Sequence, residues 1–435
     1  MANTLIIDRA RNWALDPDSD TNIDPFDIAA GDFDNDGRTD LVVSADLDAA
    51  SKTFVLLNAG NGGFDTPIAV DAVDNVSNLA IGDVNNDGNA DILTAGGQTA
   101  FPTGPNTVAV RLGDGRGGFS DDGTVTVGTN PTDTAFADVN GDGNGDLITA
   151  HYEDQTVGVR LGDGTGDFGA LSTTPIPRGA FHLRVRDIDG DGNQDVVVLS
   201  TSTLDDEAQL VPLLGDGTGG LTRADNLATA LLREDATGFD VGDFNGDGAP
   251  DFVIAHAETG VNPDHVTVVL NDGGGTLAQT RELDMGNGLI DTHVADLNGD
   301  GRDDVIGIAR GAGEAHIRLG DGDGTFTRAE TARINGDAET AGRTVAADLT
   351  GDGIPELAVA NEALDGSVSV LANNSQTGLP RVSADLDWTA AVGGDQRDTV
   401  SALAVDGNGN VVVTGFQDQR GGGAQDRAFV QKLDA

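Results

Sequence analysis

One nine-residue pattern recurs seven times along the chain and constrains its fold more than any other feature. Counted from the first aspartate of a copy, positions 1, 3, 5 and 9 carry an acidic or polar side chain and position 6 is glycine, as in ADVNGDGNGDLIT at 137–149. An apolar or β-branched run follows each copy. We number the copies as loops 1 to 7, which begin at Asp32, Asp83, Asp138, Asp187, Asp243, Asp296 and Asp348.

The spacing of these side chains indicates a cation loop. Ca²⁺ takes six to eight oxygens, and alternate residues of a tightly curled loop can all point inward to supply them. Position 7 would offer its backbone carbonyl, and glycine at position 6 permits the sharp turn. The predicted ligands at positions 1, 3, 5, 7 and 9 are Asp32, Asp34, Asp36, Arg38 and Asp40; Asp83, Asn85, Asp87, Asn89 and Asp91; Asp138, Asn140, Asp142, Asn144 and Asp146; Asp187, Asp189, Asp191, Asn193 and Asp195; Asp243, Asn245, Asp247, Ala249 and Asp251; Asp296, Asn298, Asp300, Arg302 and Asp304; and Asp348, Thr350, Asp352, Ile354 and Glu356.

Loop 7 departs from the pattern twice, with Thr350 at position 3 and Glu356 at position 9. The sequence therefore predicts up to seven Ca²⁺ ions. The alternative is that Asp-Gly loops are only turns, since this dipeptide is a common hairpin signal. Seven copies that each concentrate three or four ligand side chains would repel strongly without a counter-ion, which favours the cation sites.

EF-hand loops begin in the same way, but they need a bidentate glutamate at position 12 and helices on both sides. Position 12 carries residues without a carboxylate: Val43, Thr94, Thr149, Val198, Ile254, Gly307 and Val359. The runs after the loops, such as LVVSA and VVVLS, are typical of strands. EF-hands are therefore excluded.

A second element follows each loop after about twenty to thirty residues. Alternating apolar residues, a glycine-rich turn and a returning apolar residue predict a β-hairpin. These hairpins lie at 54–64, 108–119, 157–168, 210–221, 266–277, 315–326 and 368–379. One strand before each loop and one after it complete a four-stranded unit, so the chain is expected to be all-β, a seven-bladed β-propeller with four-stranded blades.

The alternation of DxDxDGxxD loops with VxVxLGDGxGxF hairpins over about residues 20–380 resembles the FG-GAP and VCBS repeats, known from integrin α subunits. The resemblance implies a seven-bladed propeller that holds Ca²⁺ in loops at one face and serves adhesion or scaffolding. Some blades of integrin propellers lack the cation loop. Because nearly all blades here carry it, calcium is expected to have a more structural role.

Propellers close their ring by completing one blade with strands from both chain ends, which avoids an exposed edge. The favoured closing strand is TLIID at Thr4–Asp8, and Leu379–Asp385 competes for that place. Residues 386–435 change pattern and resemble SBBP-type bacterial propeller repeats, with DGNGNVVVTG and AFVQKLD as the matching motifs. We expect residues 1–385 to form the propeller. The remainder would be an extra β unit that is incomplete or takes part in assembly.

The chain carries a formal net charge of −49. The loops hold 23 of its carboxylates at patterned positions, so calcium alone does not account for the acidity. We interpret the remainder as a surface that stays hydrated at high salt, as in a saline habitat. Nucleic acid and anionic membranes are disfavoured as partners because both require a basic patch. The sequence shows no cysteine, no recognisable signal peptide and no apolar run long enough to span a membrane.

The leading hypothesis for function is a non-catalytic, calcium-binding interaction or assembly module at the cell surface or outside the cell. Its partner would be a protein or a cell surface, and the C-terminal unit could mediate self-association. The alternative is a carbohydrate-handling propeller, either a lectin or a polysaccharide lyase. No catalytic motif supports an enzyme, and no histidine or basic cluster can be assembled from the sequence. His151 and His256, which share one position in their repeats, are expected at the surface.

Overall fold

The computed structural model describes sixteen segments of the chain, namely residues 11–15, 23–47, 50–60, 63–97, 106–201, 208–224, 231–232, 236–257, 265–274, 277–309, 313–334, 341–361, 367–373, 399–405, 411–417 and 427–433. Every regular element in these segments is a β-strand. The chain divides into two compact units, residues 1–377 and 378–435.

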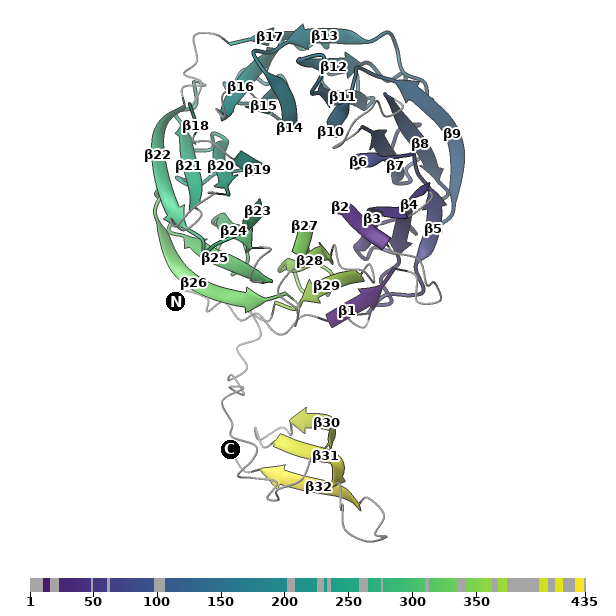
Figure 1. The fold of residues 1–435 in the computed structure, drawn as a ribbon, viewed down its shortest axis with the longest axis vertical. Coiled ribbons are helices and arrows are strands. Elements are labelled where there is room, and N and C mark those ends of the chain that lie inside the picture. Colours follow the sequence, from purple (N-terminus) through teal and green to yellow (C-terminus); the bar gives the residue numbers. More distant parts are fainter. Residues whose placement is uncertain are drawn as a thin grey trace. The chain divides into compact units, whose positions relative to one another are not determined.

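Seven antiparallel sheets form a ring in the first unit, six with four strands and one with a short fifth strand, which confirms the predicted seven-bladed β-propeller (Figure 1). The first strand of each blade lies nearest the centre. In chain order the blades are β2 (Ile23–Gly31), β3 (Asp40–Leu47), β4 (Ala50–Leu56) and β5 (Ile68–Asp71); β6 (Val76–Gly82), β7 (Asp91–Gly96), β8 (Thr107–Gly113) and β9 (Phe119–Thr126); β10 (Pro131–Ala137), β11 (Asp146–His151), β12 (Thr156–Arg160) and β13 (Ser172–Pro175); β14 (Gly179–Arg186), β15 (Asp195–Thr201), β16 (Ala208–Gly215) and β17 (Leu221–Arg223), with β18 (Leu231–Leu232) also on β16; β19 (Ala236–Gly242), β20 (Asp251–His256), β21 (His265–Asn271) and β22 (Leu277–Asp284); β23 (Leu289–Ala295), β24 (Asp304–Ala309), β25 (Glu314–Gly320) and β26 (Phe326–Arg333); and β27 (Ala341–Ala347), β28 (Glu356–Asn361) and β29 (Ser367–Leu371), with β1 (Arg11–Ala14) as the outer strand.

The hydrophobic core lies between the blades. The second strand of a blade is covered by neighbouring blades on both faces, so β7, β11, β20, β24 and β28 are buried at every residue. This explains why these strands read as continuous apolar runs. In one core cluster, Phe33 and Val42 of blade 1 pack with Leu79 and Ile92 of blade 2.

The ring closes at blade 7 through a strand from the N-terminal part of the chain. β1 pairs antiparallel with β29, with Arg11 opposite Val370 and Ala14 opposite Ser367. A strand from this end was expected, but the residues that form it are 11–14. The two candidates named from the sequence, Thr4–Asp8 and Leu379–Asp385, both lie outside the described residues.

A side-chain hydrogen bond joins the first and last blades at the same closure. The amide Nδ2 of Asn58 in blade 1 donates to the backbone carbonyl of Leu349 in loop 7 at 2.7 Å. Trp13 of β1 also packs edge-on against Phe64 of blade 1, with ring centroids 5.2 Å apart. Blades 1 and 7 are therefore joined by polar and aromatic contacts.

The second unit contains one three-stranded antiparallel sheet. Its strands are β30 (Thr399–Val405), β31 (Val411–Gln417) and β32 (Arg427–Leu433), paired in that order. The boundary predicted between residues 385 and 386 lies outside the described residues. That boundary and the resemblance to SBBP-type repeats stay predictions.

Candidate metal centres

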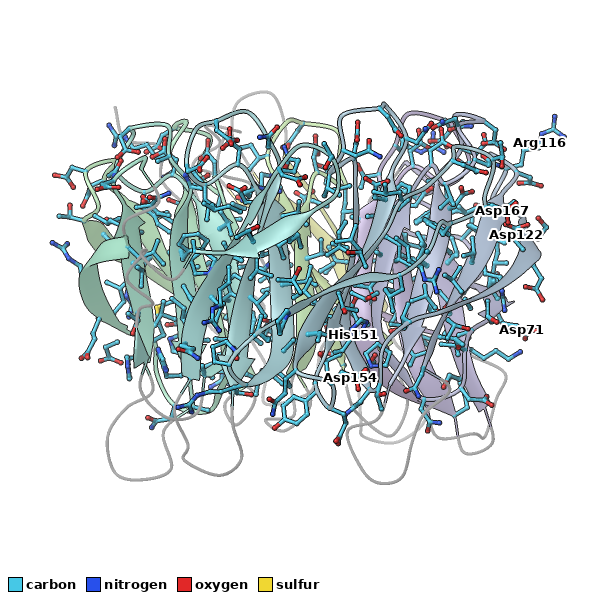
Figure 2. All side chains as sticks on the ribbon, turned by 90° about the horizontal axis from the view of Figure 1, so that it is seen from above. Asp71, Arg116, Asp122, His151, Asp154 and Asp167 are labelled. Atoms are coloured by element: carbon cyan, nitrogen blue, oxygen red, sulfur yellow. The ribbon has the colours of Figure 1, made fainter. Side chains whose placement is uncertain are left out.

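All seven loops occupy the same place in their blades. Position 1 follows the last residue of the first strand, and position 9 is the first residue of the second strand. The loops therefore lie on one face of the ring, and Figure 2 shows carboxylate oxygens gathered along that rim. Arg116 lies at this rim, whereas His151 and Asp154 lie towards the opposite side.

The carboxylate at position 1 curls each loop. In loop 3, Asp138 Oδ1 accepts the N–H of Gly141 at 2.7 Å, and Oδ2 accepts the N–H of Gly143 at 2.8 Å. Gly143, at position 6, has φ of 88°, and Gly141, at position 4, has φ of 74°. The same bond from position 6 to position 1 occurs in every loop. Position 4, always asparagine or glycine, was not recognised from the sequence as a second left-handed position.

The carboxylate at position 9 bonds to a backbone N–H at the end of the third strand of its blade or within two residues after it. Asp304 is fully buried, and its Oδ2 and Oδ1 accept the N–H groups of Leu297 and Gly320, both at 2.9 Å. Burial raises the pKa of Asp304 to about 7. It likewise raises the pKa values of Asp40 and Asp251 to about 6. A cation beside these groups would offset the cost of ionising them.

Loop 7 preserves this bond with a longer side chain. Glu356 is 1% exposed, and its Oε2 accepts the N–H of Leu349 at 2.9 Å and that of Thr350 at 3.1 Å. Its Oε1 accepts the N–H of Asn373 at 3.4 Å. Glutamate at position 9 therefore fulfils the role that aspartate has in the other loops.

Two loops bring three predicted carboxylate ligands together. Ligand atoms of Asp32, Asp34 and Asp40 in loop 1 lie within 4.8 Å of one another, and those of Asp187, Asp189 and Asp195 in loop 4 do the same. These are the two loops with aspartate at position 3. In the other loops position 3 is asparagine or threonine. The ligands at positions 1, 3 and 9 of those loops would therefore be two carboxylates and one neutral side-chain oxygen. The donors are all oxygen, which suits a hard cation such as Ca²⁺.

Position 5 is not part of either three-carboxylate group. Asp36 instead pairs with Arg38 of its own loop. Asp191 accepts the backbone N–H of Asn193 at 2.8 Å and its side-chain amide at 2.9 Å. The structure therefore gathers positions 1, 3 and 9 in these loops, and position 5 is turned towards position 7.

A second group of charged residues lies at the centre of the ring. This central network comprises residues from the first strands of blades 3 to 7: Asp133, His182, Arg184, Asp240, Asp291, His293 and Arg343. Arg343 of blade 7 lies 3.3 Å from Asp291 of blade 6 and 3.0 Å from Nε2 of His182 of blade 4. Because blades 4 and 7 are not neighbours, this contact crosses the centre of the ring.

Carboxylates of the central network are balanced by cationic side chains of the protein. Arg184 lies 3.1 Å from Asp240 and 3.7 Å from Asp133, and His293 lies 3.3 Å from Asp240. Burial opposes ionisation of Asp240, but the bonds from His293 and Arg184 outweigh it and lower the pKa. Burial also opposes a charge on His293, yet its carboxylate neighbours raise its pKa above the usual value. Burial and the nearby Arg343 lower the pKa of His182.

The prediction that no histidine or basic cluster could be assembled was therefore wrong. The sequence contains a signal for this cluster that was overlooked. Asp133, His182, Asp291 and Arg343 each stand five residues before the first aspartate of a loop, so they occupy the same position in their repeats. A one-residue register shift directly precedes Asp133, His182 and Asp291 in their strands, and Arg343 lies within the register shift of its own strand.

The prediction that His151 and His256 lie at the surface was also wrong. His151 and His256 are both fully buried. His151 Nε2 accepts the N–H of Gly128 at 3.0 Å, and burial lowers its pKa to about 4. His256 stacks on His265 of the adjacent strand, with ring centroids 4.7 Å apart. A strand buried on both faces accounts for this, since its last residue is buried with the rest.

Solved structures with a similar fold include other propellers. A Dos1 propeller has a TM-score of 0.51 at 9% identity and covers 94% of this chain and 93% of its own. The WD40 domain of Toxoplasma gondii coronin has a TM-score of 0.51 at 10% identity, covering 86% and 88%. The exotype rhamnogalacturonan lyase YesX has a TM-score of 0.49 at 14% identity, covering 85% and 75%. At these identities the first two support the fold alone.

Sequence comparison identifies the repeat itself. No curated protein matches the chain significantly. The FG-GAP-like repeat matches residues 32–94, 138–198, 187–254, 243–307 and 296–359, which together make up more than half of the chain and contain all seven loops. The chain therefore belongs to the FG-GAP-like repeat family.

Proposed function

We propose that this chain is a non-catalytic, calcium-stabilised interaction or assembly module that acts at the cell surface or outside the cell. The observation that carries the proposal is the repetition of one carboxylate geometry in all seven blades, on one face of the ring. A catalytic site would instead require one blade or a few to be specialised. Bound Ca²⁺ would supply positive charge to each loop.

The residues that would hold the ions are those of the repeated pattern. Positions 1, 3 and 9 gather in loops 1 and 4, and position 7 would add its backbone carbonyl. Position 5 would have to rotate away from the N–H of position 7 to join them. Loop sites of this kind suit extracellular calcium, with dissociation constants on the order of 10⁻⁴–10⁻³ M.

The proposed location and partners follow from the family and the charge. Repeats of this family are usually extracellular. In the segments that the structure describes, no helix is long and apolar enough to cross a membrane. The net charge of −49 disfavours nucleic acid. We therefore favour a protein or a cell surface as the partner, with self-association through residues 386–435 as a second mode.

Calcium titration of the full chain tests the metal part of this proposal. Isothermal titration calorimetry and equilibrium dialysis should give close to seven ions per chain. Replacing the aspartate at position 1 by alanine should remove one ion per loop changed. A chain that binds no calcium at millimolar concentration would contradict the proposal. Size-exclusion chromatography with and without residues 387–435 tests self-association.

The central network favours a second candidate function, a carbohydrate-handling propeller. Nδ1 of His182 lies 3.4 Å from Asp133, which is the arrangement of a carboxylate-oriented general base. Arg343 lies 3.0 Å from Nε2, so its guanidinium would have to turn to the carboxylate of an acidic sugar before Nε2 could act as the base. A glycan array tests for a lectin, and the absorbance of unsaturated sugar products tests for a lyase. The lyase is supported only if His182→Asn abolishes a measured activity.

A further inference from the structure

Side-chain amides connect the loops of the first three blades. Asn35, at position 4 of loop 1, donates from Nδ2 to Oδ1 of Asn89, at position 7 of loop 2, over 2.7 Å. Asn86, at position 4 of loop 2, donates in the same way to Asn144, at position 7 of loop 3, also over 2.7 Å. Two successive pairs of neighbouring loops are therefore joined at the same two positions.

Each amide pair fits against a glycine of the hairpin in the following blade. A Cβ atom at Gly115 would lie 2.3 Å from Asn89 Oδ1 and 2.4 Å from Asn35 Nδ2. Gly164 stands in the same relation to the second amide pair, at 2.3 and 2.4 Å. A side chain at either glycine would displace the amides, so the contact involves three elements from two blades.

The backbone conformation at position 4 is less favourable for asparagine than for glycine. Asn35 and Asn86 have φ of 56° and 57°, a region that glycine adopts more easily. The other five loops have glycine at this position, at 141, 190, 246, 299 and 351. Asparagine therefore adds a side chain at a site where the fold does not require one.

Loop 4 provides an internal control for this interpretation. It has asparagine at position 7, Asn193, but loop 3 has Gly141 at position 4. Without a donor from the neighbouring loop, Asn193 donates from Nδ2 to Asp191 of its own loop at 2.9 Å, while its Oδ1 still lies against the hairpin glycine, 2.5 Å from the Cβ position of Gly217. The connection between loops thus requires asparagine at both positions.

We propose that Asn35 and Asn86 couple the cation sites of loops 1, 2 and 3, and that loop 4, which has no such amide bond to loop 3, binds its ion independently of them. This inference rests on the proposed calcium binding. Position 4 lies between the ligands at positions 3 and 5, so an ion that orders one loop also fixes the amide. That amide holds position 7 of the next loop, whose carbonyl is a predicted ligand. Coupling of this kind is reciprocal, and typical couplings change affinity about fivefold or more.

Two single-loop variants of the full chain test the coupling. Asp83→Ala removes the site of loop 2, and Asp187→Ala removes that of loop 4. Calcium titration of Asp83→Ala should show one site lost and two of the remaining sites weakened about fivefold or more. Asp187→Ala should lose one site and leave the sites of loops 1 to 3 unchanged. In an Asn35→Gly/Asn86→Gly background, which has the residue the other loops use, Asp83→Ala should also lose one site only.

The possible results distinguish a failure of the coupling from a failure of the proposed calcium binding. Equal behaviour of Asp83→Ala and Asp187→Ala, with all other sites unchanged, overturns the coupling but not the calcium binding. The coupling through Asn35 and Asn86 is also overturned if Asp83→Ala weakens two further sites in the Asn35→Gly/Asn86→Gly background. A chain without any calcium binding overturns the proposed metal sites and the coupling together. Circular dichroism of each calcium-free variant verifies that the propeller is folded.

Discussion

The cation loops and the central network are two carboxylate-rich regions that handle their charge differently. In the central network, Asp240 and Asp291 each have an arginine and a histidine as neighbours. In the described part of the loops, the ion pairs to patterned carboxylates are those of Arg38 with Asp36 and of Arg302 with Asp300. The protein thus supplies counter-charge to Asp240 and Asp291 at its centre, whereas at the loops the proposed cation would supply it.

Removal of calcium should produce the largest effect. At a free concentration tenfold above the dissociation constant, each site stabilises the folded state by about 1.4 kcal/mol, or about 10 kcal/mol for seven sites. We expect chelation to lower Tm by roughly 10 °C or more, measured by differential scanning calorimetry. Addition of Mg²⁺ should restore little of this loss, because Mg²⁺ keeps its water ligands. A Tm that does not respond to chelator would remove the contrast between the two regions.

Within the loops, the position 9 carboxylate should matter more than the position 5 carboxylate. Asp304→Ala leaves two buried N–H groups, of Leu297 and Gly320, without an acceptor. We expect a loss of about 2–5 kcal/mol in the free energy of unfolding even without calcium. Asp300→Ala removes a predicted ligand but no buried bond, and should cost under about 1 kcal/mol without calcium. Urea unfolding in chelator compares the two, and equal losses would contradict the structural role of position 9.

In the central network, Arg343→Leu should destabilise the propeller independently of calcium. The change leaves the buried carboxylate of Asp291 without one of its cationic partners. Because the Arg343 side chain is 31% exposed, we expect about 2 kcal/mol, less than for a fully buried pair. Arg116→Leu, at the exposed rim, is the control and should change stability by less than about 0.5 kcal/mol. A loss that disappeared in calcium would mean that the two regions are not independent.

The dependence of stability on pH should differ with and without calcium. Burial raises the pKa values of all seven position 9 carboxylates, to about 6 for Asp40, Asp91 and Asp251 and about 7 for Asp304, so the calcium-free folded state binds more protons than the unfolded state. Its free energy of unfolding should therefore fall as pH rises from 4 to 7. The stabilisation by calcium should instead grow over this range, because the ion binds the ionised form. Thermal melts in high salt, which screens the general repulsion, measure both trends. A calcium-free chain that became more stable towards pH 7 would contradict this account.

Local spacing was enough to predict the loops and the blades. The ligands of one loop lie within nine residues, and Gly143 is placed by the turn that those residues make. The hairpin at 108–119 likewise needs only its own alternation and its glycine-rich turn, and it forms β8 and the start of β9. Short-range geometry of this kind is contained in consecutive residues, which is why the number of blades could be counted from the sequence.

Contacts between blades were decided by the tertiary structure. Arg343 and His182 are 161 residues apart and meet only because the ring places their strands around one centre. Asn35 and Asn89 meet because consecutive blades are set side by side at a fixed height. The sequence by itself determined the local chemistry of each repeat. Closure of the ring decided which charges neutralise one another and which loops are joined, since both depend on distances across blades that no local pattern contains.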